Sequence, residues 1–564
     1  MLLPKAKDTQ FWAAVREDPA YRPLLDELLR QYAKSAEGEI ECLKYSDFRL
    51  FFTTGNRSVY EEKYFIRRSR LNACALLSLL YPEKEEYLTK LEDTVWAVCD
   101  EYNWALPAHI SDWEQNCNAF LDLFAAETGF ALSEIKYLLG DRLSPLIQNR
   151  ISYEVRRRIF QPFLQESYWW YSAESNWAAV CGGSVACAFL YEWPEKFYEI
   201  KPRIDAVMEC FLKSYKEDGV CREGISYWEY GFGFFVFYAD LLRQFSDGRY
   251  DYFQEDRIRT IAVFLQKMFL TENVTVSFAD GQMHSGYNLG LLHFLKSVYP
   301  EEIMLPPFAY HTITDKCARW CWELRSFLYF DKNYPQSGEI RREEIYLEQS
   351  AWFVKKTSAY SFATKAGDNG EPHNHNDVGT FLLAMDGEQI LCDLGAGEYT
   401  AQYFNAQTRY QIFCNSSFSH CVPIINGKGQ TVSEKYYGEM SLAGEKLRID
   451  MSHAYDAPEL VSLVREFTFE ENAVTVCDRF QMEGSFTERF VTLHRPEVRE
   501  EGVLLGDCLL IAFDAERFTP VISEHVHIWH NGGEAVVYAV DFLPKTEETD
   551  TFSARLVCIP ERIA

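Results

Sequence analysis

The stretch LVREFTFEENAVTVCDRFQMEG, residues 463–484, alternates apolar and polar side chains on both sides of the polar break EEN. Alternation with a period of two is typical of strands that bury one face, and a short polar break between two such runs indicates a turn. Residues 346–367, 379–395 and 534–543 show the same pattern. This part of the chain is therefore predicted to form an antiparallel β-sandwich.

The chain before about residue 330 has a different period. Its apolar residues recur at steps of three and four, as in helices, between short runs of Pro, Gly and Asp. The helical segments expected are 64–80, 86–102, 132–139, 184–191, 204–215, 232–245 and 258–270. Recurring helix pairs favour a helical array or toroid. The period changes after about Gly338, so we predict a helical domain over residues 1–335 and a β domain over residues 336–564.

The charge balance narrows the possible partners. The 564 residues include 56 Lys and Arg against 84 Asp and Glu, a net charge of −28. Nucleic-acid binding needs a basic surface, and so does docking on an anionic membrane, so neither partner is expected. Aromatic residues make up 16% of the chain, which suits a helix-rich core or a surface that stacks on sugars.

The cysteines and the N-terminus favour a cytoplasmic protein. The sixteen cysteines contain no CxxC pair, and in so long a chain they indicate reduced thiols. The opening MLLPKAKDTQFWAAV lacks the apolar stretch of a secretory signal. A periplasmic or secreted protein is expected only if a signal has been removed.

Histidine is scarce, at twelve residues, so its clustering is informative. The segment HNHND (residues 373–377) places His373 and His375 two residues apart, and Asp393 and His420 follow. In an extended strand, both histidines and Asp377 would share one face. Two histidines and a carboxylate with an open position are a typical zinc site. The alternative is a set of strand-face histidines paired with carboxylates, but the glycines nearby favour a tightly shaped site.

A second cluster, His525, His527 and His530 in EHVHIWH, has no nearby Asp and no glycine framing. It is interpreted as a sheet face.

Two helical segments carry further candidates. Tyr227 and Tyr230 lie three residues apart at the start of a helix, close to Glu223 and Trp228. A tyrosine can shuttle protons if its environment lowers its pKa, but an aromatic packing cluster is the simpler interpretation. Asn176 precedes another helix, as a cap or as an amide donor to a substrate carboxylate.

Aromatic residues gather near these segments. Trp104 and His109 share the loop NWALPAH, and Trp177 follows Asn176. Together with Trp228 they could line a sugar-binding surface, or they could belong to the core.

Several motifs together resemble the heparinase II/III-like polysaccharide lyases. The motifs, in the family's order, are WALPAH (104–109), SNW (175–177), EGISYWEYG (223–231), HNHND with D-x-G-x-G-x-Y (373–399), and SH (419–420). The resemblance covers most of the chain. It implies an α/α toroid, expected here to be incomplete, followed by an antiparallel β-sandwich.

The resemblance also implies an activity, the cleavage of uronate-containing polysaccharides of glycosaminoglycan or alginate type by β-elimination. Asn176 would neutralise the substrate carboxylate, which stabilises the enolate. Tyr227 would be base, acid or both, with Tyr230 as the alternative, and His373 would be a second acid/base. The candidates for contacts with the substrate are Trp104, His109, Trp177, Trp228, Tyr230 and Arg409.

The resemblance implies a divalent metal, with zinc expected, bound by His375, Asp393 and His420, with Asp377 beside the ligands. One departure concerns Trp177, because several relatives have a histidine directly after the neutralising Asn. Either the preference for one uronate epimer is narrower here, or the correspondence is shifted by one residue.

Two other functions stay open from the sequence. HxHxD also opens the metal site of metallo-β-lactamase-like hydrolases, but Val378 stands where those enzymes have a further His. The other possibility is a non-catalytic carbohydrate-binding protein on a lyase scaffold. In the leading interpretation the partner is a uronate polysaccharide or oligosaccharide, with short oligosaccharides preferred to highly sulfated chains. The oligomeric state stays open, with a homodimer as one possibility.

Overall fold

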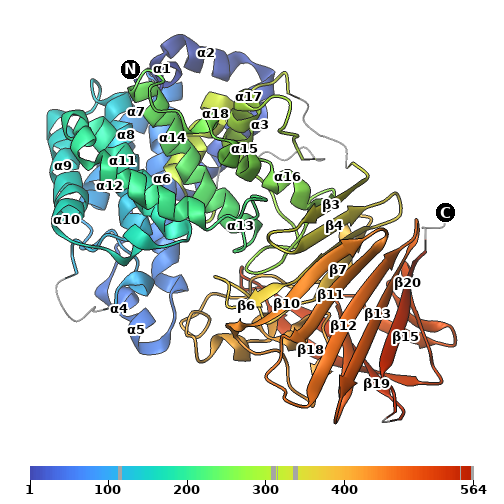
Figure 1. The fold of residues 1–564 in the computed structure, drawn as a ribbon. Coiled ribbons are helices and arrows are strands. Elements are labelled where there is room, and N and C mark those ends of the chain that lie inside the picture. The colour runs from blue at the N-terminus through green and yellow to red at the C-terminus, as the bar shows by residue number, and fades with distance from the viewer. Residues whose placement is uncertain (112–116, 307–312, 314, 335–340, 547, 560–564) are drawn as a thin grey trace.

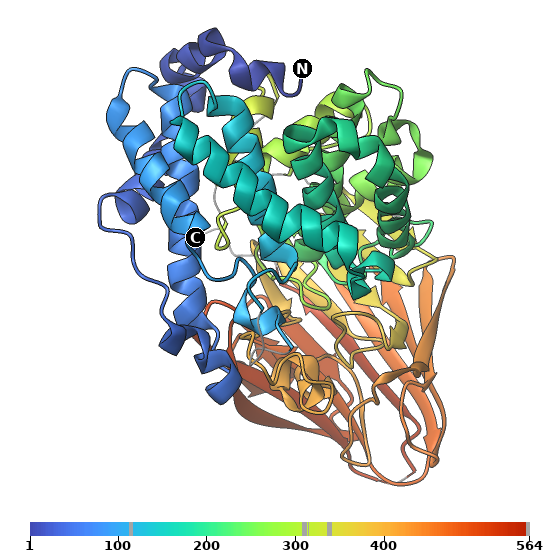
Figure 2. The same ribbon diagram turned by 90° about the vertical axis from the view of Figure 1, so that its left-hand side faces the viewer.

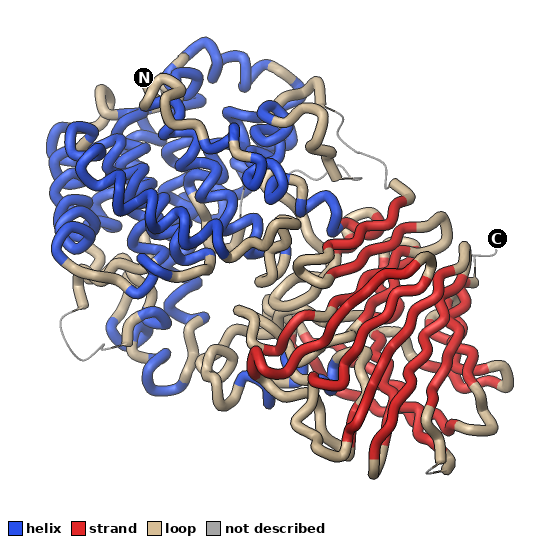
Figure 3. Tube along the Cα trace, viewed as in Figure 1, coloured by secondary structure: helices blue, strands red, loops and turns tan. Residues whose placement is uncertain are grey.

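The computed structural model describes residues 1–564 except 112–116, 307–312, 314, 335–340, 547 and 560–564. Helices fill the first part of the chain and antiparallel strands the second (Figures 1 and 3). An α/α toroid followed by a β-sandwich is therefore confirmed. The boundary predicted between residues 335 and 336 lies outside the described residues. Among the described helices, none combines the length and apolar character needed to cross a membrane.

The helical domain is built from α-helices that run back and forth. They are α1 (Pro4–Lys7), α2 (Thr9–Glu17), α3 (Arg22–Ala36), α4 (Tyr45–Phe48), α5 (Leu50–Thr54), α6 (Ser58–Leu80), α7 (Glu85–Cys99), α8 (Leu123–Leu139), α9 (Pro145–Val155), α10 (Gln161–Gln165), α11 (Asn176–Glu192), α12 (Pro194–Lys213), α13 (Ile225–Tyr227), α14 (Gly233–Phe245), α15 (Asp256–Ala262), α16 (Phe264–Met268), α17 (Leu289–Val298) and α18 (Trp320–Tyr329).

All seven predicted helical segments overlap these helices. The segment predicted over 258–270 differs at its end, because the helix stops at Met268 and β1 begins at Phe269. A π-helical turn, η5 (Trp228–Phe232), joins α13 to α14. The last helix, α18, packs against α17 and the early helix α6. Arg325 of α18 also pairs with Glu134 of α8 in the interior, at 2.8 Å.

The strands form four antiparallel sheets. They are β1 (Phe269–Thr271), β2 (Val274–Thr275), β3 (Glu343–Leu347), β4 (Trp352–Lys356), β5 (Ser361–Lys365), β6 (Gly367–Asn369), β7 (Phe381–Met385), β8 (Glu388–Leu391), β9 (Ile424–Ile425), β10 (Ser433–Ala443), β11 (Lys446–His453), β12 (Leu460–Phe469), β13 (Ala473–Met482), β14 (Phe486–Thr492), β15 (Pro496–Arg499), β16 (Gly502–Leu505), β17 (Leu509–Phe513), β18 (Phe518–Ile528), β19 (Glu534–Pro544) and β20 (Thr551–Cys558).

The sandwich has one large sheet and two smaller ones. The large sheet has the order β15-β16-β17-β20-β13-β12-β11-β10-β6, and the smaller sheets are β3-β4-β5-β7-β8 and β18-β19-β14-β9. Phe362 of β5 packs on Phe467 of β12, and Phe490 of β14 packs on Phe552 of β20, so both smaller sheets face the large one. Strands β12 and β13 alternate buried and exposed residues, as the opening sequence pattern predicts.

The five-stranded sheet is buried on both faces, which ties the two domains together. Every residue of β5 and β7 is buried. Ala363 and Leu382 belong to the core of the helical domain, whereas Phe362 and Phe381 belong to the core of the sandwich. Ser361 also donates a hydrogen bond to Leu270 O at 2.7 Å. Side chains from the two domains are therefore held in fixed positions at their interface.

A second contact between the domains lies at the loop after α5. Figure 2 shows helices α4 and α5 reaching down beside the β domain. A Cβ placed on Gly55 would lie 3.2 Å from the Cβ of Ala401, in the segment that follows β8.

Candidate active site

Four segments from both domains meet at the interface. Asn176 is the first residue of α11, and Tyr227 is the last of α13. Asp280 lies in the loop after β2, and His373 in the loop between β6 and β7. Asp280 and His373 are hydrogen-bonded, and Tyr227 packs on His373. The structure thus brings together the three residues predicted to be catalytic, which are distant in sequence.

Tyr227 is held between His373 and Tyr399. The centroids of the Tyr227 and His373 rings are 4.2 Å apart, and the Tyr227 hydroxyl lies 3.0 Å from that of Tyr399. Tyr399 donates its own proton to Asp280 Oδ2 at 3.2 Å, so Tyr227 is the donor to Tyr399. Burial, aided by the Asp280 charge, raises the pKa of Tyr227, which keeps this phenol protonated at neutral pH.

Asp280 is the centre of the network, and sequence reasoning missed it. Its buried carboxylate accepts hydrogen bonds from five side chains: His373, His375, Tyr399, Tyr403 and Arg409. Burial opposes its charge, but Arg409 and the two histidines hold the pKa of Asp280 well below its usual value. In the sequence, ADG (residues 279–281) indicates only a turn. Arg409, predicted to contact substrate, is instead buried against Asp280 at 3.0 Å.

His373 has a left-handed backbone, with φ of 56°. Such a conformation is uncommon outside glycine and is often found at functional sites. The prediction that HNHND forms a strand is therefore wrong. Pro372 lacks an N–H for a sheet, and Gly379 also has a positive φ, so the segment is a loop. Arg409 holds this loop by donating to His373 O at 3.0 Å.

The predicted metal ligands lie together. His375, Asp393 and His420 each offer one ligand atom, and these atoms lie within 4.8 Å of one another. All three residues are fully buried. Asp393 follows β8, and Asp386, with a φ of 46°, lies in the turn between β7 and β8.

The donor atoms of this cluster fit a metal ion. His375 Nδ1, Asp393 Oδ2 and His420 Nδ1 are buried and bond to no group outside the cluster, and Asp393 Oδ2 lies 3.2 Å from His420 Nδ1. The second nitrogen of each imidazole is oriented, in His375 by Asp280 at 3.2 Å and in His420 by Cys414 O at 3.1 Å. Histidines that bind metals are commonly oriented in this way. Asp377 is not one of the three: it pairs with Lys365 at 2.9 Å, close enough to the cluster for its charge to act on His420.

Asn176 is bound to a carboxylate that the predicted roles did not include. Its side-chain Nδ2 donates to Glu223 Oε2 at 2.8 Å, and its backbone N–H donates to Oε1 at 3.3 Å. The same Oε2 lies 3.5 Å from His373 Nε2. Glu223 therefore holds the side-chain amide of Asn176 in place at the start of α11.

Aromatic side chains of the helical domain form a partly exposed group. The His109 ring packs edge-on to Trp177 at 5.0 Å, and Trp177 contacts Trp169 at 4.8 Å. Trp169 is 59% exposed. Asp122 fixes the His109 ring through Nδ1 at 2.6 Å. Trp169 is the exposed member of this group, whereas one face of His109 stacks on Phe124.

Trp104 and Trp228 lie in the core instead. Both are almost fully buried, and their indole N–H groups donate to Val98 O and Ile261 O. They offer no ring face to a ligand.

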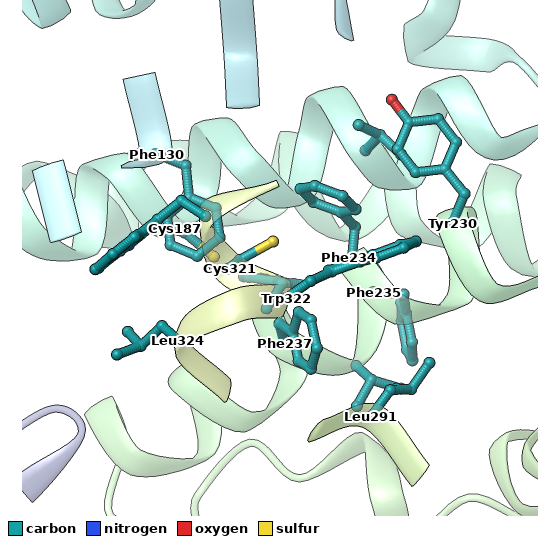
Figure 4. Close-up of a cluster of buried hydrophobic side chains, with 14 of the residues drawn as sticks. Phe130, Cys187, Tyr230, Phe234, Phe235, Phe237, Leu291, Cys321, Trp322 and Leu324 are labelled. Carbon is teal, nitrogen blue, oxygen red and sulfur yellow. The ribbon is translucent and has the colours of Figure 1, made fainter. Parts of the chain in front are cut away.

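Tyr230 points away from Tyr227. Its ring lies at the edge of a buried cluster with its hydroxyl directed outward (Figure 4). The hydroxyl donates to Glu127 at 2.5 Å, and the Arg319 guanidinium lies 3.9 Å from the ring centroid. The π-helical turn η5 separates the two tyrosines, and Tyr227 is the one that reaches His373.

The second histidine cluster divides into two parts. His525 and His527 lie on β18, as predicted for a sheet face. His530 follows that strand, and its ring lies 4.3 Å from the ring of Tyr399. Only this proximity in the folded chain identifies His530 as a neighbour of the site.

Residues 339–508 match the family model described as heparinase II/III-like, C-terminal. No curated protein sequence matches the chain. Among solved structures, the chain is similar to a heparan sulfate lyase HepC mutant from Pedobacter heparinus, at 14% identity and a TM-score of 0.63, covering 98% of this chain and 91% of that one.

The chain is also similar to a heparinase III, at 10% identity and a TM-score of 0.65, with coverage of 98% and 92%. A third similar structure is the Streptomyces coelicolor A3 chondroitin AC lyase in complex with chondroitin sulphate, at 9% identity and a TM-score of 0.56, with coverage of 98% and 82%. The toroid-and-sandwich fold of these structures extends over the whole chain. The match to the heparinase II/III-like family model thus lies within the β domain, and the similarity of fold extends to the helical domain.

Proposed function

We propose that this protein is a polysaccharide lyase that cleaves uronate-containing poly- or oligosaccharides by β-elimination. One observation carries the proposal: Asn176, Tyr227 and His373, from two domains, lie around one point of the interface. Elimination needs a group that neutralises the C5 carboxylate, a base for the C5 proton and an acid for O4. An amide, an imidazole and a phenol supply these functions.

The hydrogen bonds suggest a role for each group. His373 Nδ1 lies 2.6 Å from Asp280 Oδ2, so the neutral ring carries its proton there and Nε2 can accept the C5 proton. Tyr227, which burial keeps protonated, can supply the proton to the departing O4. Asn176 has a second amide hydrogen for the substrate carboxylate, because Glu223 takes only one.

A divalent metal, with zinc as our proposal, would be held by His375, Asp393 and His420. Support comes from the three buried ligand atoms, which lie within 4.8 Å of one another and bond to no group outside the cluster. When bound, the ion would supply positive charge that holds these three side chains in place. His375 also contacts Asp280, so the ligands and His373 share one anchoring carboxylate.

The test is to incubate the protein with heparan sulfate, chondroitin sulfate, hyaluronan and alginate, with zinc supplied, and to record the ultraviolet absorbance of the unsaturated uronate. A lyase produces this chromophore. New reducing ends without the chromophore would indicate a hydrolase, and binding without cleavage would indicate a carbohydrate-binding protein. Either result would refute the proposal for these substrates.

A further inference from the structure

Glu223 lies beside Asn176, at the position proposed for the substrate carboxylate, where a second negative charge would be repelled. Its Oε2 is 2.8 Å from Asn176 Nδ2 and 3.5 Å from His373 Nε2. A substrate carboxylate bound by Asn176 would therefore come close to Glu223. Two carboxylates that share a site do not both stay ionised without a large cost, and one of them takes up a proton.

The hydrogen-bond pattern already places a proton near this carboxylate. His373 Nδ1 donates to Asp280, so a neutral His373 ring directs the lone pair of Nε2 towards Glu223 Oε2. If Glu223 were ionised as well, two acceptors would face each other at 3.5 Å. A proton on one of the two groups removes this repulsion.

The surroundings of Glu223 favour its neutral form. The residue is 5% exposed, and it lines a small pocket together with Glu174, Arg222 and Pro372. Burial raises the pKa of Glu223, against the opposing effects of His373 and Asn176. The titratable groups that face it from the elements around it are Tyr215, Cys221, Arg222, Tyr227, Asp280 and His373.

We propose that Glu223 is a further catalytic residue, which donates a hydrogen bond in its protonated form to the carboxylate of the bound uronate, beside Asn176. This inference rests on the proposed lyase function. Asn176 and Glu223 would then form a neutral pair of donors, which lowers the cost of the negative charge that develops on the carboxylate during elimination. Where Glu223 is ionised in the free protein, binding one uronate takes up one proton from solvent.

The experiment compares Glu223→Gln and Glu223→Ala with the wild type, on the polymer of the four tested that the wild type cleaves fastest. In the wild type, we expect KM to rise about tenfold per pH unit above the pKa of Glu223. Glutamine keeps a neutral donor, so Glu223→Gln should keep kcat within about tenfold and show a flat KM. Glu223→Ala should have a high KM at every pH.

A matched control is Glu174→Gln, which changes an exposed carboxylate of the same pocket and should keep the wild-type pH profile. A Glu223→Gln protein with the wild-type slope of KM would overturn the proposal. A loss of kcat of more than about a hundredfold at every pH, with normal thermal unfolding, would also overturn it, because Glu223 would then act as an anion.

A second measurement does not depend on how the Glu223 variants fold. Calorimetry of Tyr227→Phe with hyaluronan tetrasaccharide, in two buffers of different ionisation enthalpy, should show uptake of one proton per uronate bound above the pKa of Glu223. Binding without uptake would contradict the role of Glu223. A wild type that forms no unsaturated product would refute the lyase function itself, which is a separate result.

Discussion

Asp280 Oδ2 lies 2.6 Å from His373 Nδ1, while Oδ1 of the same carboxylate lies 3.2 Å from His375 Nε2. A loop of the helical domain, between β2 and α17, thus orients both the proposed acid/base histidine and a proposed metal ligand. Because this carboxylate is fully buried, neither histidine can turn without breaking a charged hydrogen bond.

Asp280→Asn should lower kcat by at least about a hundredfold, because an amide no longer fixes the tautomer of His373. The same change should weaken metal binding by about tenfold or more, since the orientation of His375 is also lost. The product's absorbance and elemental analysis measure the two effects. The control is Asp218→Asn, which changes a carboxylate that binds Ser350 across the interface but outside the site. Equal losses of kcat in both variants would contradict the role of Asp280.

Tyr227→Phe should lower kcat by at least about a hundredfold, the usual scale for the loss of a general acid or base. The matched variant Tyr230→Phe should leave kcat within about tenfold, because Tyr230 binds Glu127 and not His373. The rate of unsaturated product formation measures both. Near-normal turnover of Tyr227→Phe would move the role to another group.

His420→Ala should release the metal and lower the thermal unfolding temperature, since a buried ion stabilises the folded state that binds it. The control is His284→Ala, which removes an exposed histidine outside the cluster. Elemental analysis and thermal unfolding measure the outcome. An unchanged metal content would show that His420 is not a ligand.

Trp177→Ala should raise KM by roughly tenfold with a smaller change in kcat, because stacking of a sugar on a partly exposed indole contributes about 1 kcal/mol. Trp104→Phe should leave KM unchanged and lower stability, since Trp104 is 1% exposed. Initial rates over a range of substrate concentrations separate KM from kcat. An effect of Trp104→Phe on KM as large as that of Trp177→Ala would contradict the placement of the sugar.

Glu127→Gln should change the pH dependence of stability. Burial raises the pKa of Glu127 from 4.5 to about 7, so the folded state holds this proton more tightly than the unfolded state. The stabilisation of the folded state by this proton is complete below pH 4.5 and is lost as the pH rises through about 7. The variant should therefore gain stability over the wild type across this range, by at most about 3 kcal/mol. Urea unfolding of both proteins at pH 5 and pH 8 measures their difference in free energy of unfolding. The same difference at both pH values would contradict the raised pKa of Glu127.

The sequence alone determined the order of the domains and the type of each element. Apolar residues recur every three to four residues in a helix and every two in a strand, and this spacing shows which side chains face a core. The information is local to each helix or strand. The candidate metal cluster was also accessible, because histidine is scarce, at twelve residues, and the family resemblance implied the three ligands. His375, Asp393 and His420 were predicted as ligands, and in the structure they lie together.

Only the tertiary structure decided which of several similar residues reach the site. Trp104 and Trp177 each follow an Asn and precede an Ala, but Trp104 is buried and Trp177 lies beside the exposed Trp169. The roles of Asp280 and Glu223 arise from partners on other segments: Arg409 lies 129 residues after Asp280, and His373 lies 150 residues after Glu223. The period of apolar residues shows which face of each helix or strand is buried. The five-stranded sheet packs against both domains, and this packing decides which buried side chains of the two domains come into contact.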